Sequence, residues 1–276
     1  MRIALVQQYA GPDRQENLQR ALDAARLVAT GGAQLVAYAE LGLEPFYPAT
    51  PAGGGAPLLL AEEIPGPTTE AFCELARQLG IVIVLNLYER DGERAYDSSP
   101  VIDADGRILG VTRMLHIADM PSFHEQGYYT PGDRGMPVYD TKAGRVGVAI
   151  CYDRHYPEVM RSLGLQRAEV VVIPQAGAVG EWPEGLYEAE VRTAAFQNGY
   201  FAALVNRVGK EPGIEFAGES FVCDPDGKVV ARAPSRQESL LVTDLDLSAC
   251  ARSHARRLFL RDRRPELVPS LLRFRG

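Results

Sequence analysis

Cys151 has the sequence context of a catalytic nucleophile. It follows the apolar run 146–150 (VGVAI) and precedes a polar run and then a helix signal that begins near Pro157. A thiol at such a strand-to-helix elbow is raised above the end of the sheet. There the helix N-terminus favours the thiolate, and the next backbone N–H, that of Tyr152, can stabilise an oxyanion. Most cysteines without a disulfide are simply small buried apolar residues, which is the alternative to this hypothesis.

Glu40 is the candidate base for this thiol. It lies just after the apolar strand expected at 35–38 (LVAY). Parallel strands bring their carboxyl ends together at one edge of a sheet, so Glu40 and Cys151 can converge despite their separation in sequence. We expect Glu40 to accept the thiol proton. The alternative is an ordinary loop carboxylate in water.

Other chemistries lack their signatures. Neither G-x-G-x-x-G nor G-x-x-x-x-G-K-[ST] occurs, so we expect no nucleotide cofactor. The four histidines lack i,i+4 spacing and no cysteine pair lies near any of them, which predicts no metal site. The cysteines form no C-x-x-C pair, which argues against a disulfide framework. The histidines are His116, His124, His155 and His254, and the other cysteines are Cys73, Cys223 and Cys250.

Composition narrows the class of partner. The chain has 276 residues with 29 basic and 36 acidic side chains, a net charge of −7. This balance argues against nucleic-acid and anionic-membrane partners and favours small molecules. The polar residues that follow 1–6 leave no signal-peptide core, and no apolar run reaches the length of a transmembrane helix. We therefore expect a cytoplasmic protein with a single domain over 1–276.

Strand and helix signals alternate along the chain, and two hairpins turn at 103–106 (DADG) and 224–227 (DPDG). This pattern predicts an α/β protein with mixed sheets, each covered by helices on one face. The tail 259–276 has little core pattern, so we expect it to pack on a partner. Strands are expected at 3–7, 35–38, 81–87, 145–150, 170–173 and 201–205, and helices at 15–28, 69–79, 157–165 and 186–197.

Over nearly its whole length the chain resembles the nitrilase superfamily of carbon–nitrogen hydrolases. The resemblance rests on AEL around Glu40, HEQGYYTPGD at 124–133, CYDRHYPE at 151–158, EVRTAA at 190–195 and the pair 206–207 (NR). It implies a four-layer αββα sandwich of two mixed β-sheets and a Glu–Lys–Cys triad that needs no cofactor. It also implies that Glu125 is the second glutamate of the site, and that the protein is a homodimer or larger homo-oligomer.

The chain departs from the family motif at the lysine. The family has Arg-Lys-x-His-[IL], whereas residues 113–117 read RMLHI, so Met114 stands at the lysine position. Arg113 is no simple substitute, because neighbouring residues of a strand point to opposite faces. Two interpretations follow: a hydrolase of small amides or N-carbamoyl compounds whose activity is reduced by Met114, or an impaired relative that only binds such a ligand.

The segment after the nucleophile bears on substrate class. It is similar to β-ureidopropionases and N-carbamoyl-amino-acid amidohydrolases, which implies that Arg154 binds a substrate carboxylate and that His155 and His116 also contact substrate. Alternatively, Arg154 pairs with Glu158 or Asp153.

The end of the chain gives a different indication. Residues 259–267 (FLRDRRPEL) resemble N-carbamoylputrescine amidases, whose substrate carries a cation. The charge at the far end of the substrate therefore stays open.

Overall fold

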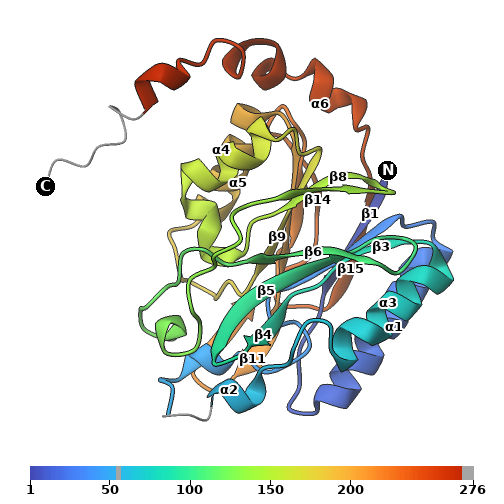
Figure 1. The fold of residues 1–276 in the computed structure, drawn as a ribbon, viewed down its shortest axis with the longest axis vertical. Helices are drawn as coiled ribbons and strands as arrows, with labels where there is room; N and C mark the ends of the chain where they lie inside the picture. Colours follow the sequence, from blue (N-terminus) through green and yellow to red (C-terminus); the bar gives the residue numbers. More distant parts are fainter. Residues whose placement is uncertain (54–56, 269–276) are drawn as a thin grey trace, which may run out of the picture.

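The computed structural model describes residues 1–53 and 57–268, and it contains two β-sheets that face each other with helices on their outer sides (Figure 1). The first sheet has the order β15 (Ser239–Asp244), β1 (Arg2–Gln7), β2 (Leu35–Tyr38), β3 (Val82–Val84), β5 (Arg94–Ile102), β4 (Leu87–Asp91), with β6 (Ile108–Arg113) also pairing with β5. The second has the order β14 (Val229–Arg232), β13 (Phe221–Cys223), β10 (Phe201–Asn206), β9 (Val170–Gln175), β8 (Gly144–Val148), β7 (Val138–Thr141).

Alternation along the strands builds the layers. In β1, Ile3 and Leu5 pack into a core shared with Val148 of the second sheet. The residues between them, such as Ala4, face helices instead. Because successive side chains of a strand point to opposite faces, one strand fills two cores. This is the predicted αββα sandwich of two mixed sheets, and the fold class is confirmed.

Four helices form the outer layers. Helices α1 (Arg14–Thr30) and α3 (Pro67–Leu79) cover the first sheet, and α4 (Pro157–Leu165) and α5 (Leu186–Asn198) cover the second. Asp13 caps α1 by accepting hydrogen bonds from the backbone of Gln15 and Glu16, as its position before the apolar pattern predicts. The short elements are α2 (Pro57–Leu60), the 3₁₀ turn Tyr47–Ala49 and the hairpin β11 (Val208–Glu211) to β12 (Ile214–Ala217).

The expected strand at 81–87 is two strands, β3 and β4. Between them lies the buried Asn86, whose side chain hydrogen-bonds Asp97 and Ser99 and accepts from the backbone of Leu41. Strand β15 was not predicted. It pairs antiparallel with β1 from the far end of the chain, and its exposed outer positions weaken its apolar pattern.

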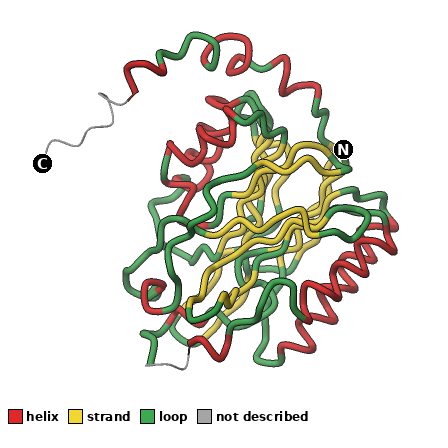
Figure 2. The backbone as a smooth tube through the Cα atoms, viewed as in Figure 1, coloured by secondary structure: helices red, strands yellow, loops and turns green. Residues whose placement is uncertain are grey.

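The chain after β15 leaves the sandwich. Helix α6 (Ser248–Arg252) and the turn Ala255–Phe259 are followed by a segment that runs outward beyond α4 and α5 (Figure 2). Phe259 packs edge-on against Phe196 of α5, with 5.3 Å between the ring centroids. The apolar residues 271–274 of the predicted tail lie outside the described residues. None of the helices within 1–53 and 57–268 has the length and apolar character needed to cross a membrane.

Candidate active site

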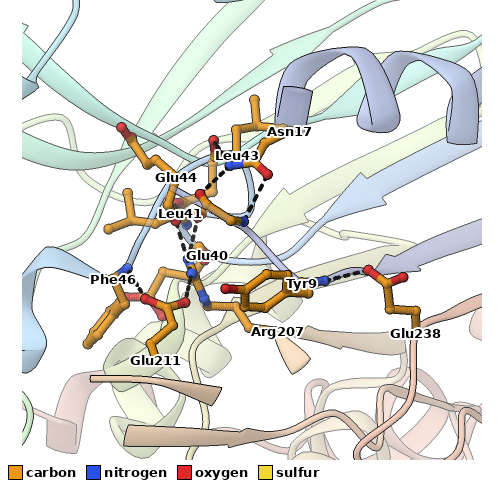
Figure 3. A network of polar contacts seen from close by, with 12 residues as sticks. Tyr9, Asn17, Glu40, Leu41, Leu43, Glu44, Phe46, Arg207, Glu211 and Glu238 are labelled. Atoms are coloured by element: carbon orange, nitrogen blue, oxygen red, sulfur yellow. Dashed lines mark hydrogen bonds and ion pairs between the residues drawn. The ribbon is translucent and has the colours of Figure 1, made fainter. Parts of the chain in front are cut away.

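The loop after β2 carries Glu40 into the interior. Its turn is held by Arg207, at the end of β10 in the other sheet, which donates hydrogen bonds to the backbone carbonyls of Glu40 (3.1 Å) and Glu44 (2.9 Å) and to that of Leu41 (Figure 3). Glu211 pairs with the same guanidinium. Arg207 is therefore a buried brace that joins the two sheets at the candidate base.

The backbone of this turn is strained, since Leu41 has φ 43°, a left-handed conformation that costs a β-carbon-bearing residue energy. Asn86 holds it, because its side-chain oxygen accepts the Leu41 N–H at 2.8 Å. The Asn86 amide in turn donates to Asp97 of β5 at 2.5 Å. A polar network thus fixes the direction in which Glu40 points.

Cys151 lies at a sharp bend just past β8, with φ 43°. The residues Cys151–His155 form a 3₁₀ turn, and α4 begins only at Pro157. We expected the helix N-terminus to favour a thiolate, but this was wrong for the resting site. Burial, and then the charges of Glu40 and Glu125, raise the pKa of Cys151 well above its usual range, so the sulfur is a thiol.

Glu125 completes the centre. It begins the 3₁₀ turn Glu125–Gly127 and is fully buried, and one of its oxygens accepts the Ala118 N–H at 3.1 Å. One carboxylate oxygen each from Glu40 and Glu125 and the sulfur of Cys151 all lie within 4.8 Å of one another. Three residues separated by up to 111 positions in the sequence therefore meet in one small buried volume.

Asp97 is a fourth acidic group of this centre, and it was missed from the sequence. Burial is the main cause that raises its pKa, to about 7. Burial, followed by the charges of Asp97 and Glu125, raises the pKa of Glu40 well above its usual range, and burial and then Asp97 do the same to Glu125. The run DSS at 97–99, polar within a strand otherwise apolar, was the signal for it.

Met114 lies directly after β6 and is 1% exposed. It belongs to the buried cluster that also contains Cys151 and Ala39, the neighbour of Glu40. Its backbone is fixed to β5 by an N–H bond to the Asp97 carbonyl at 2.9 Å. An uncharged thioether is therefore buried in the same cluster as the candidate nucleophile.

Arg113 turns away from this centre, as the alternation of a strand predicts. Its guanidinium makes ion pairs with Glu89 (2.6 Å), Asp91 (2.6 Å) and Asp133 (2.9 Å) and stacks on Tyr96. Across 1–53 and 57–268, neither arginine nor lysine forms an ion pair with Glu40 or Glu125.

Arg154 is buried beneath the nucleophile. One of its terminal nitrogens donates to the Cys151 carbonyl (3.0 Å) and to the side-chain oxygen of Gln175 (2.7 Å), and its Nε lies 3.5 Å from Glu190. It stacks on Tyr187, 4.3 Å from the ring centroid. The alternative prediction, that Arg154 pairs with Glu158 or Asp153, named the wrong partner: the carboxylate next to Arg154 is that of Glu190.

The two histidines expected near substrate have structural contacts. His116 bonds Asp153 through Nδ1 (2.7 Å) and stacks on Tyr156 with 3.4 Å between centroids. His155 bonds Glu190 through Nδ1 (2.7 Å).

Asp153 also accepts the backbone N–H groups of Leu115 and His116 at 3.0 Å, and so fixes the segment after Met114 to the nucleophile turn. The backbone N–H of Tyr152, next after the nucleophile, stays our predicted oxyanion donor.

Gln175 was also missed. Its side-chain nitrogen donates to the Cys151 sulfur at 3.2 Å. It is the last residue of β9, two residues beyond the strand end expected at 173, and the strand-end rule that selected Glu40 would have found it with a correct boundary.

A buried cysteine between two carboxylates, at the strand ends of an αββα sandwich, defines a thiol-dependent hydrolase. The carbon-nitrogen hydrolase family model matches residues 2–255, and the chain belongs to this family of enzymes. It is 36% identical over 223 residues to the N-carbamoylputrescine amidase of Arabidopsis thaliana, covering 76% of this chain and 75% of that protein.

Solved structures agree. A carbon-nitrogen hydrolase from Helicobacter pylori G27 superposes with a TM-score of 0.91 and 28% identity, covering 99% of this chain and 98% of that one. A Glu-to-Gln mutant of the amidase from Nesterenkonia sp. AN1 superposes with a TM-score of 0.84 and 27% identity, covering 99% and 97%. In that structure the acetamide moiety of fluoroacetamide is added covalently at the active-site cysteine.

Proposed function

We propose that this carbon-nitrogen hydrolase cleaves an N-carbamoyl amine through a thioester on Cys151. The observation that carries the proposal is the meeting of Glu40, Glu125 and the Cys151 sulfur within 4.8 Å. A ligand-binding relative with no reaction has no chemical need for a thiol between two carboxylates, so the geometry favours hydrolysis over binding alone.

The reaction needs one base used twice. The Glu40 carboxylate takes the thiol proton as the Cys151 sulfur attacks the ureido carbon, and the Tyr152 N–H faces the developing oxyanion. When the C–N bond breaks, Glu40 gives this proton to the departing ammonia. Glu40 then takes a proton from water as the water attacks the thioester, and returns it to the sulfur. The released carbamic acid loses carbon dioxide to give the amine.

Charge near the nucleophile supports a cationic far end of the substrate. Arg154 is paired with Glu190, so its charge is largely balanced. Glu181 is half-buried and accepts a hydrogen bond from the hydroxyl of Tyr187, the ring on which Arg154 stacks, so a second carboxylate lies close to Arg154. The plant relative named above carries N-carbamoylputrescine in its name, a substrate with such a cation.

One observation favours a second candidate, an N-carbamoyl acid. The other terminal nitrogen of Arg154 is buried and has no hydrogen-bond partner among the residues that the structure describes. A substrate carboxylate could pair with it, since a guanidinium accommodates two-point contacts with planar anions.

Three ureas of similar length separate the candidates. N-carbamoylputrescine has a cationic end, N-carbamoyl-γ-aminobutyrate an anionic end and N-butylurea a neutral end. Ammonia release from each, compared as kcat/KM, is expected to rank the cation first. A highest kcat/KM for the anion would instead establish the second candidate. No ammonia from any of them, together with no Cys151 adduct by mass spectrometry, would contradict hydrolysis of N-carbamoyl compounds.

A further inference from the structure

The Glu40–Glu125–Cys151 centre has the composition and spacing of a metal site. Its three donor atoms lie within 4.8 Å of one another. In a tetrahedral zinc site with Zn–S near 2.3 Å and Zn–O near 2.1 Å, sulfur and oxygen ligands are about 3.6 Å apart. The donors would therefore need to approach one another by only about 1 Å, which side-chain rotation can supply.

The donors are also unsatisfied. Within residues 1–53 and 57–268, both carboxylate oxygens of Glu40 and one of Glu125 are buried without a hydrogen-bond partner. Buried polar atoms without a partner are rare and require a ligand, a water or an ion to explain them. The Glu40 oxygen that lies within 4.8 Å of the Cys151 sulfur is one of these.

The lack of a nearby positive charge is a third, independent reason to expect a cation at this centre. Met114 brings no positive charge to the wall of this centre, and the three lysines, Lys142, Lys210 and Lys228, are all exposed. Arg154, which donates to the Cys151 carbonyl, is itself held by Gln175 and Glu190. Ionising these buried groups without a counter-charge is costly, so a divalent cation that replaces their protons supplies the positive charge that the site lacks.

We infer that a divalent cation of borderline softness, with Zn²⁺ as the probe, binds reversibly to Glu40, Glu125 and Cys151 in the place where a lysine side chain is absent. A thiolate with two carboxylates suits Zn²⁺, whereas Mg²⁺ requires six oxygen ligands. On binding, the thiol proton and the protons that the two buried carboxyl groups carry pass to solvent, and the sulfur and the carboxylate oxygens become ligands. The bound ion occupies the nucleophile and so inhibits hydrolysis, a regulatory step beyond the proposed reaction.

Binding is tested without any substrate. Zn²⁺ is titrated into the full-length protein in competition with a chromogenic chelator, and Co²⁺ is added separately to look for a thiolate-to-cobalt charge-transfer band. Wild type is expected to bind one ion per chain and to show the band. Mg²⁺ at the same concentration is expected not to compete.

Variants locate the ion. Cys151→Ala is expected to lose the cobalt band and to weaken Zn²⁺ binding at least about tenfold, since one of three ligands is gone. Met114→Lys is expected to weaken binding by a similar or larger factor while every ligand is kept, because it places a positive charge in the wall. Cys73→Ser, which alters the half-buried cysteine of α3, is the matched control and should bind as wild type.

Zn²⁺ affinity unchanged in Cys151→Ala, or lost in Cys73→Ser, would overturn the inference, as would no stoichiometric binding by wild type. If Met114→Lys binds Zn²⁺ as wild type does, the charge argument is wrong and so is the inferred place of the ion. Because these measurements need no turnover, failure here is distinct from failure of the hydrolase proposal, which the urea panel decides.

Discussion

The guanidinium of Arg207, at the end of β10 in one sheet, donates a hydrogen bond of 3.1 Å to the backbone carbonyl of Glu40, beyond the end of β2 in the other. The same group binds the carbonyls of Leu41 and Glu44 and is 1% exposed. Charged hydrogen bonds across the sandwich therefore fix the turn that aims the candidate base. Arg207 is a positioning residue, since it reaches the chemistry only through the backbone of Glu40.

Arg207→Lys tests this positioning. The ammonium keeps the charge opposite Glu211 but lacks the planar fork that reaches several carbonyls. Losing one or two charged hydrogen bonds, at about 1.5–3 kcal/mol each, is expected to lower kcat about 10–100-fold with a smaller change in KM. Arg20→Lys, in an exposed ion pair with Glu238, is the control and should change kcat little. An equal effect of both variants on kcat would argue against positioning.

The contact of Arg207 with the Glu40 turn shows what could and could not be predicted from the sequence. Strand-end position was enough to select Glu40 and Cys151, because parallel strands share an edge. No sequence pattern indicated that Arg207 would hold the Glu40 turn, because the contact spans 167 positions and joins two sheets. Asp97 was missed although the polar run 97–99 marks its position, because its role comes from the side chains around it and a hairpin pattern indicates only which face it occupies.

Asp97 predicts a pH dependence of stability. Its pKa is about 7 in the folded protein against 3.8 ordinarily, so the folded state holds a proton that the unfolded chain releases. Its contribution to stability is thus greatest at low pH and is lost as the pH rises toward 7. Asp97→Asn removes this loss. From pH 5 to pH 7 the variant is expected to gain about 2–3 kcal/mol in unfolding free energy relative to wild type.

Urea unfolding at both pH values measures the Asp97 effect. Asp105→Asn is the matched control, because Asp105 is exposed in a hairpin turn and its neighbour Arg107 lowers its pKa. The control should show no such slope between pH 5 and pH 7. A difference between Asp97→Asn and wild type that does not change with pH would mean that Asp97 is already ionised at pH 5.

A groove of about 770 Å³ between α4 and α5, with Arg263 and Val268 of the tail in its wall, is where we expect a second copy to pack. Leu165 lines it and is 43% exposed. Burying the exposed part of Leu165 contributes about 1 kcal/mol, and a carboxylate at this position must also be desolvated, so Leu165→Glu should weaken self-association at least about tenfold by light scattering. Leu27→Glu, at an exposed side chain of α1, should leave self-association unchanged. A monomeric wild type at micromolar concentration would contradict the expectation.

Met114→Lys should restore a cation to the centre. The positive charge is expected to lower the pKa of Glu40, which burial and two carboxylates now raise, and so to move the acid limb of kcat/KM to lower pH. One oxyanion donor is typically worth 10²–10³ in rate, so we expect at least about a tenfold faster acylation in single-turnover experiments. Met120→Lys, at a half-buried methionine nearby in sequence, is the control. An acylation rate that Met114→Lys leaves unchanged or lowers would show that another group already stabilises the oxyanion in the wild type.

A variant at Arg154 distinguishes a structural role of this side chain from a role in substrate binding. Its Nη1 holds the Cys151 carbonyl and Gln175, whose amide in turn donates to the Cys151 sulfur at 3.2 Å. Removing the guanidinium should therefore loosen the nucleophile turn whatever substrate is bound. For Arg154→Ala we expect kcat/KM to fall about 10–100-fold, the value of one charged hydrogen bond, and by the same factor for the cationic, neutral and anionic ureas.

If Arg154 instead binds a substrate carboxylate, Arg154→Ala lowers kcat/KM for the anionic urea alone. The kcat/KM for the cationic urea is then unchanged or higher. Arg161→Ala is the matched control for the Arg154 experiment. Arg161 lies on α4 and donates to the Gln197 carbonyl at 2.8 Å, so it contacts a neighbouring helix rather than the nucleophile turn. Arg161→Ala is expected to keep a kcat/KM near that of wild type. A loss of kcat/KM in Arg154→Ala that is confined to N-carbamoyl-γ-aminobutyrate would show that Arg154 binds the substrate carboxylate. An equal loss for all three ureas would show that Arg154 holds Cys151 in place.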